Sequence, residues 1–261
     1  MIQRNRSFRL GYSTISWGPT PDLDAVLRVV ADAGWEGVEF ISISLDWLGT
    51  PGRVRSLLDR YALPPVCMFG NVSLADDAVA VLERQRRLIE YAGELGCSIY
   101  CFLGGQRVVQ RLPTDDELKR LAEQAEILID YASPFGLTVA YHAHPRCTVE
   151  SEAEQDRLLA YANRLQVCVD VSVAAMMEED AITQLQKYRD RLAYVHMKDL
   201  ARGKFCQMGK GTVGLDFRRI REVLGEIGYR GWVIGELSHY ADTEAAESCY
   251  ANREYLRSQG Y

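Results

Sequence analysis

The order in which two kinds of segment alternate along the chain limits its fold more than any other feature. Apolar runs of about five residues, rich in β-branched and aromatic side chains, are each followed by a longer stretch with helical periodicity. This order is typical of a parallel sheet in which every strand is followed by a helix. Eight such runs predict strands near residues 9–15, 37–41, 65–69, 98–103, 138–142, 167–170, 192–196 and 232–236.

Signals for helix ends support this alternation. Four helical stretches are each followed by a glycine just before the next strand, and glycine accepts the left-handed conformation of a helix C-cap. These glycines are Gly34, Gly96, Gly136 and Gly228. Pro21-Asp22 and Pro113-Thr114 stand where two of the helices should begin.

Eight strand–helix units without a linker could form a closed barrel or an open, doubly wound sheet. An open dinucleotide-binding sheet needs GxGxxG directly after its first strand, where this chain reads SWGPTPD. Residues 209–212, GKGT, lack the glycine spacing of a phosphate-binding loop, and no predicted strand precedes them. Because 261 residues is the usual length of one barrel, we predict a single α/β domain over residues 1–261, a (β/α)₈ TIM barrel.

Composition limits the partners of the chain. A formal net charge of −6 and a pI near 5.4 provide no general cationic field for nucleic acid phosphates or for an anionic membrane surface. We see no apolar run of signal-peptide or membrane-spanning length, and we therefore expect a cytoplasmic protein. The seven cysteines are scattered through mostly apolar segments, which indicates buried thiols rather than a structural zinc site. The expected partner is a small molecule, and the sequence leaves a homo-oligomer open.

Acidic and histidine side chains gather at the predicted C-terminal ends of the strands, the rim on which barrel enzymes carry their reacting groups. They are Glu39, His142, His144, Asp170, His196, Glu236 and His239. All four histidines of the chain are in this set. Carboxylates and imidazoles that converge on one mouth suit one divalent ion, Mn²⁺, Co²⁺, Mg²⁺ or Zn²⁺, with open positions left for a substrate.

Seven segments, taken in order, carry a more specific signal than any of them alone. They are GYSTISW at 11–17, AGWEGVEF at 33–40, YHAHPRCTVESEAEQDRLL at 141–159, VDVS at 169–172, HMKD at 196–199, GKGTVGLDF at 209–217 and GYRGWVIGEL at 228–237. With them the chain resembles, over nearly its whole length, the sugar isomerase and epimerase superfamily of xylose-isomerase-like barrels. Within that superfamily it is most similar to the inosose dehydratases.

The resemblance implies a metal held by a Glu, an Asp, a His and a Glu from strands five to eight or the turns after them. In this chain the matching residues are Glu150, Asp170, His196 and Glu236. Many members of the superfamily place the first glutamate directly at the end of strand five, where this chain has His142. Imidazole binds the same metals, so His142 and Glu150 are both candidates for the first ligand.

Further site residues follow from the same positions. We expect proton transfer by Glu150, Glu236 and His142. We expect substrate contacts from Trp17, Glu39, His144 and Lys198. The alternatives are rim packing for Trp17, capping for Glu39, and an ion pair with Asp199 or another mouth carboxylate for Lys198. The superfamily usually has Asp-Thr-Gly-His after strand six, and this chain has Val173 in place of that histidine. A pocket without this imidazole should recognise a substrate different from inosose, or have lost activity.

We therefore expect a metal-dependent isomerase or epimerase that removes the proton α to the carbonyl of a small polyhydroxy sugar or cyclitol, through an enediolate. If a β-hydroxyl leaves the same intermediate, the enzyme is a dehydratase, with His142, His144 or Lys198 as candidate acid. A non-catalytic sugar-binding barrel is the alternative from another class, because a fold does not prove an activity. Nucleases of this superfamily need a histidine-rich, multi-metal site and a basic face, which four histidines and a net charge of −6 do not provide.

Overall fold

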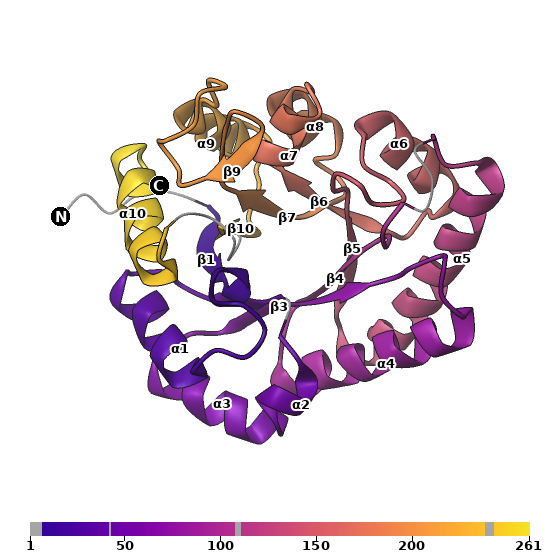
Figure 1. The fold of residues 1–261 in the computed structure, drawn as a ribbon, viewed down its shortest axis with the longest axis horizontal. Helices are drawn as coiled ribbons and strands as arrows, with labels where there is room; N and C mark the ends of the chain where they lie inside the picture. The colour runs from indigo at the N-terminus through magenta and orange to yellow at the C-terminus, as the bar shows by residue number, and fades with distance from the viewer. Residues whose placement is uncertain (1–6, 42, 108–110, 238–242) are drawn as a thin grey trace.

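Eight parallel strands close into a barrel in the computed structural model, which describes residues 7–41, 43–107, 111–237 and 243–261 (Figure 1). Around the barrel the strands follow the order β1-β10-β7-β6-β5-β4-β3-β2. They are β1 Arg9–Ser13, β2 Val38–Phe40, β3 Pro65–Asn71, β4 Ile99–Leu103, β5 Thr138–His142, β6 Gln166–Asp170, β7 Leu192–Met197 and β10 Trp232–Gly235. Every strand ends within two residues of its prediction, and the (β/α)₈ barrel is confirmed.

Helices surround the barrel on its outside (Figure 1). They are α1 Leu23–Asp32, α2 Leu45–Leu48, α3 Pro51–Arg60, α4 Ala78–Leu95, α5 Asp115–Ala132, α6 Glu152–Tyr161, α7 Val171–Met176, α8 Ala181–Lys187, α9 Phe217–Glu226 and α10 Ala245–Ser258, with short 3-10 helices at Thr14–Trp17 and Ser133–Phe135. The start of α5 is fixed by a capping box, in which Thr114 and Glu117 bond each other's backbone N–H groups. Gly96 ends α4 in the left-handed region, with φ at 88°. No helix in the described ranges is both long and apolar enough to cross a membrane.

A two-stranded antiparallel hairpin, β8 Asp199–Ala201 and β9 Lys204–Cys206, interrupts the connection from β7 to α9. The glycine-rich stretch at 209–212 follows this hairpin and folds around Asp199. The Asp199 carboxylate accepts from the backbone N–H groups of Gly209 and Gly211, at 2.9 and 3.0 Å. A Cβ at position 211 would lie 1.8 Å from that carboxylate, so this turn requires glycine.

The barrel interior is filled by an apolar layer from alternate strand positions, separate from the larger core between barrel and helices. Cys67, Cys101 and Cys168 belong to this layer and are at most 2% exposed. The Sγ atom of Cys67 lies 3.8 Å from the hydroxyl of Tyr194 in the same layer. Burial raises the pKa of all three thiols, as predicted for buried cysteines.

Candidate active site

Six ionisable side chains meet just above this layer, at or directly after the C-terminal ends of β2, β5, β6, β7 and β10. They are Glu39, His142, Asp170, His196, Lys198 and Glu236, and none is more than 4% exposed. Buried charged groups are costly unless they are paired, so a cluster of this kind indicates a functional site.

His196 is held between two carboxylates. Its Nε2 atom lies 2.9 Å from Glu39 Oε2, and its Nδ1 atom lies 3.6 Å from Glu236 Oε1. His196 Nδ1 and Glu39 Oε1 are buried and have no hydrogen-bond partner among the described residues. Burial alone would lower the pKa of His196, but Glu39 and Glu236 raise it to about 10. A histidine that donates one ring N–H to a carboxylate presents its other nitrogen in a fixed direction, as metal-binding histidines do.

Lys198 connects the two other buried carboxylates. Its ammonium donates hydrogen bonds to Asp170 Oδ2 and Glu236 Oε1. The second oxygen of Asp170 caps α7, accepting from the backbone N–H groups of Ser172 and Val173 at 2.9 and 3.0 Å. Burial would lower the pKa of Lys198, but Asp170 and Glu236 hold it above its usual value. Lys198 reaches the site because it is two residues after His196, so both side chains face the barrel mouth.

The two histidines after β5 differ in their surroundings. His142 Nδ1 lies 2.7 Å from the carbonyl of Ala143, which can only accept, so Nδ1 carries a proton and Nε2 faces Asp170 Oδ2 at 3.6 Å. The ring centroid of His144 lies 5.5 Å from that of His142. Burial, together with the charges of His142 and Lys198, lowers the pKa of His144 to about 4. His144 is therefore neutral near pH 7.

Among the described residues, two groups of side chains have the spacing of metal ligands. One consists of Glu39, His196 and Glu236, and the other of His142, Cys168 and His196, with the ligand atoms of each group within 4.8 Å of one another. His196 belongs to both groups. The donor set fits a divalent cation, but Glu236 also binds the Lys198 ammonium, so a metal and this lysine would share that carboxylate. Asp170, a predicted ligand, belongs to neither group and binds Lys198 as well.

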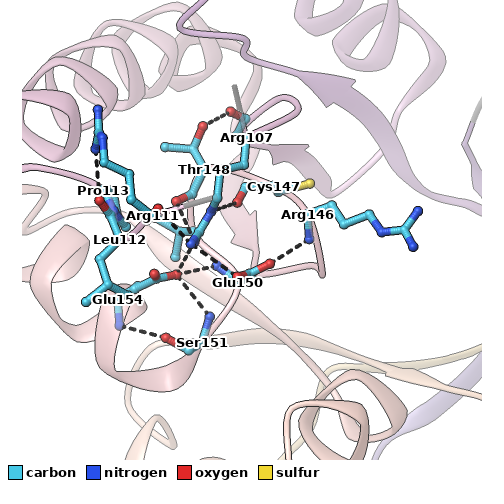
Figure 2. Close-up of polar contacts among 12 residues, drawn as sticks. Arg107, Arg111, Leu112, Pro113, Arg146, Cys147, Thr148, Glu150, Ser151 and Glu154 are labelled. Carbon is cyan, nitrogen blue, oxygen red and sulfur yellow. Dashed lines mark hydrogen bonds and ion pairs between the residues drawn. The ribbon is translucent and has the colours of Figure 1, made fainter. Parts of the chain in front are cut away.

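Glu150 is engaged elsewhere, in the loop between β5 and α6 (Figure 2). Its carboxylate lies 3.1 Å from Arg107 Nη1 and accepts from the backbone N–H of Arg146 at 2.7 Å. Arg107 also pairs with the buried Glu154 at 2.6 Å. Glu150 belongs to neither of the two ligand groups, so its predicted role as a metal ligand would require the ion pair with Arg107 to break.

A cavity of about 1090 Å³ opens above the site. Among the predicted residues, His142, His144, His196, Lys198 and Glu236 line it. Phe69 and Phe205 also line it, and sequence reasoning missed both. Phe69 ends the third predicted strand but has no polar neighbour, and Phe205 lies outside every predicted strand.

Two predicted substrate contacts lie outside the cavity lining. Glu39 is fully buried against His196, and Trp17 is half-buried with its ring edge-on to Tyr12 at 5.8 Å. His239, the remaining rim histidine, lies outside the described residues.

Comparisons with known proteins agree with the fold. The family described as xylose isomerase-like TIM barrel matches residues 27–259. The chain is 28% identical to the inosose dehydratase of Geobacillus kaustophilus (strain HTA426), over 88% of this chain and 87% of that protein. The structure of L-ribulose 3-epimerase superposes with a TM-score of 0.83 at 18% identity, over 97% of this chain and 95% of that one. For 3-keto-D-glucoside 4-epimerase from E. coli the TM-score is 0.77 at 21% identity, over 97% and 98%. At these identities the two structures establish the fold alone.

Proposed function

This chain belongs to the xylose isomerase-like TIM barrel family, and from that premise we propose that it is a divalent-metal-dependent enzyme acting on a small polyhydroxy carbonyl compound. The reaction begins with removal of the proton α to the carbonyl and ends as an isomerisation or epimerisation. Two solved structures with this fold are sugar epimerases, and a relative covering most of the chain is an inosose dehydratase. Dehydration of a keto-cyclitol or keto-sugar is therefore the second candidate.

The observation that carries the proposal is the buried cluster beneath a large cavity. Three carboxylates, two imidazoles and one ammonium meet at one barrel mouth with almost no exposure to solvent. A barrel needs no such groups for its stability, because hydrophobic residues fill its interior. Their position under a cavity large enough for a small sugar favours chemistry on a bound ligand.

The residues present fit a divalent cation. His196 would bind through Nδ1, which Glu39 directs toward Glu236, and Asp170 and Glu236 would each supply an oxygen. His142 or Glu150 would complete the set. A metal bound there would polarise the substrate carbonyl and stabilise negative charge on its oxygen.

Proton transfer is assigned to side chains that line the cavity. Glu236 accepts the α-proton, because its carboxylate is held ionised beside Lys198 and faces the cavity. His142 offers Nε2 for returning the proton at another carbon or face. In the dehydratase reaction His142, His144 or Lys198 would donate the proton to the leaving hydroxyl. The rings of Phe69 and Phe205 exclude water from the reacting carbons.

Solvent isotope exchange tests the proposal directly. The protein is incubated in D₂O with Mn²⁺ and a panel of ketoses and ketocyclitols, and deuterium uptake is measured by mass spectrometry and NMR. We expect exchange into at least one substrate, with loss of exchange after removal of the metal by a chelator. The product then distinguishes the reactions, because epimerisation preserves mass apart from deuterium and dehydration removes water. A metal-loaded protein that exchanges no proton in any member of the panel would contradict the proposal.

A further inference from the structure

The charges that line the cavity are unevenly balanced. Among the described residues, five basic ones line it, Arg84, Arg146, Lys198, Lys204 and Lys210, against two acidic ones, Asp76 and Glu236. Arg84 pairs with Asp76 at 3.2 Å, and Lys198 pairs with Glu236. The other three basic residues have no carboxylate within 4.0 Å among the described parts of the chain. A protein with a net charge of −6 thus carries unmatched positive charge at this mouth.

Arg146 is held in an unusual backbone conformation. Its φ is 68°, in the left-handed region that favours glycine and that costs other residues of order 1 kcal/mol or more. The conformation is fixed from both sides, since the Arg146 N–H donates to Glu150 and its carbonyl accepts from the Arg107 N–H, each at 2.7 Å. On the Arg146 side, both bonds involve only backbone atoms. The side chain itself extends away from the Arg107–Glu150–Glu154 cluster (Figure 2).

Two ring contacts show how the loop that carries Arg146 lies relative to the β8–β9 hairpin and Lys198. The rings of His144 and Phe205 are 6.1 Å apart, which brings the loop of Arg146 against the β8–β9 hairpin that carries Lys204. The Lys198 ammonium lies 4.4 Å from the centre of the Phe205 ring. Phe205 therefore lies against the buried Lys198, whereas Arg146, Lys204 and Lys210 are exposed.

We propose that the substrate carries a negatively charged group, a carboxylate or a phosphate ester, and that Arg146 binds this group at the cavity rim with Lys204 and Lys210 beside it. The proposal rests on the proposed function in that it names the substrate class of the same cavity. A guanidinium binds either anion with paired hydrogen bonds, and Arg107 and Glu150 hold the loop in position for it. The uncharged end of the substrate then extends past Phe205 toward Glu236.

Three polyols with the same carbon skeleton form the test, D-glucitol, D-gluconate and D-glucitol 6-phosphate. Their affinities are measured by titration calorimetry on the whole protein, at low and high salt. We expect at least one anion to bind about tenfold or more tightly than glucitol, with an advantage that shrinks as salt rises. Preference for gluconate would identify a sugar acid, and preference for the ester a sugar phosphate.

Arg146→Gln should remove most of this preference and leave glucitol binding unchanged. Arg202→Gln is the matched control, because Arg202 is also an exposed arginine with positive φ, at 53°, but it does not line the cavity. Arg146→Gly relieves the backbone and should raise the melting temperature while still losing the anion preference. If Arg146 had only a structural role in its loop, Arg146→Gly would raise the melting temperature without changing the anion preference.

Two results would overturn the inference: equal affinity of the wild-type protein for glucitol and both anions, or equal losses in Arg146→Gln and Arg202→Gln. Neither measurement depends on turnover. Anion binding without solvent exchange would count against the proposed reaction alone, and exchange on neutral ketoses without anion preference would count against this inference alone.

Discussion

Replacing Lys198 by methionine tests how the buried charges of the site are balanced. Lys198 is 1% exposed and hydrogen-bonds both Asp170 and Glu236, so methionine keeps the length of the side chain but leaves two buried carboxylates without a cation. Removing one partner of a buried ion pair costs about 3–5 kcal/mol. At about 2–4 °C per kcal/mol for a protein of nearly this size, the melting temperature in chelator should fall by about 6–20 °C.

A divalent metal should reverse most of that loss, because it replaces the missing positive charge. Binding at a concentration 100 times its Kd stabilises by about 2.7 kcal/mol. In the wild-type protein the metal must first displace the ammonium, so we expect a larger metal-induced rise in melting temperature for Lys198→Met than for wild type. The assay is thermal denaturation of both proteins in chelator and in excess Mn²⁺.

Lys187→Met provides the control for this experiment. Lys187 also lies between two carboxylates, those of Glu152 and Asp156, but its side chain is 38% exposed. An exposed pair contributes about 0–1 kcal/mol, so its removal should change the melting temperature by a few degrees at most, with no dependence on metal. Equal melting temperatures of Lys198→Met and wild type in chelator, or equal metal-induced shifts, would refute the reasoning.

Three other substitutions and one titration each probe a single role. Glu236→Gln should retain part of the bound metal but stop deuterium exchange, since an amide cannot accept the proton. Metal content and exchange are measured on one preparation, and full exchange would show that Glu236 does not transfer the proton. His142→Ala should lower turnover by about 10²–10⁴ while metal content stays constant, and loss of metal would identify His142 as a ligand instead. Glu39→Gln should weaken metal binding by about 10–100-fold in calorimetry, because the carboxylate that orients His196 loses its charge. Unchanged affinity would show that Glu39 does not support the metal site. His144 should titrate near pH 4 in NMR spectra, and titration near 6.5 would contradict its burial. Because this histidine binds its proton more weakly in the folded than in the unfolded chain, the free energy of unfolding should fall by up to about 3 kcal/mol as the pH drops from 6.5 to 4.

The sequence predicts the barrel well because its signals are local. Alternating periodicity places each strand, and the C-terminal end of a strand in a barrel always faces the mouth, so Asp170, His196 and Glu236 could be brought together without coordinates. A helix cap such as Thr114 with Glu117 is equally local, since both partners lie within one turn.

Contacts that depend on distant partners were not predictable in the same way. The Glu39 carboxylate contacts His196, which lies 157 residues away in the sequence. Nothing in the sequence around Glu39 distinguishes a residue that contacts His196 from one that contacts a substrate. An ion pair of Lys198 with a mouth carboxylate was one of the alternatives, but the sequence could not identify the partners. They are Asp170 and Glu236 rather than Asp199, whose carboxylate binds the glycine turn. The β8–β9 hairpin has strands of three residues each, which are too short to show a periodicity. The position of Phe205 at the cavity was therefore not predictable from the sequence.

The three thiols of the barrel interior allow opening of the barrel to be measured by chemical modification. An alkylating reagent dissolved in water cannot reach Cys67, Cys101 or Cys168 while the strands around them stay paired. Their modification rate therefore reports how often the barrel opens, and the pattern of modification reports how it opens. If the ring of strands separates as one unit, all three sulfur atoms react together; if a single seam parts first, the thiol nearest that seam is modified before the others.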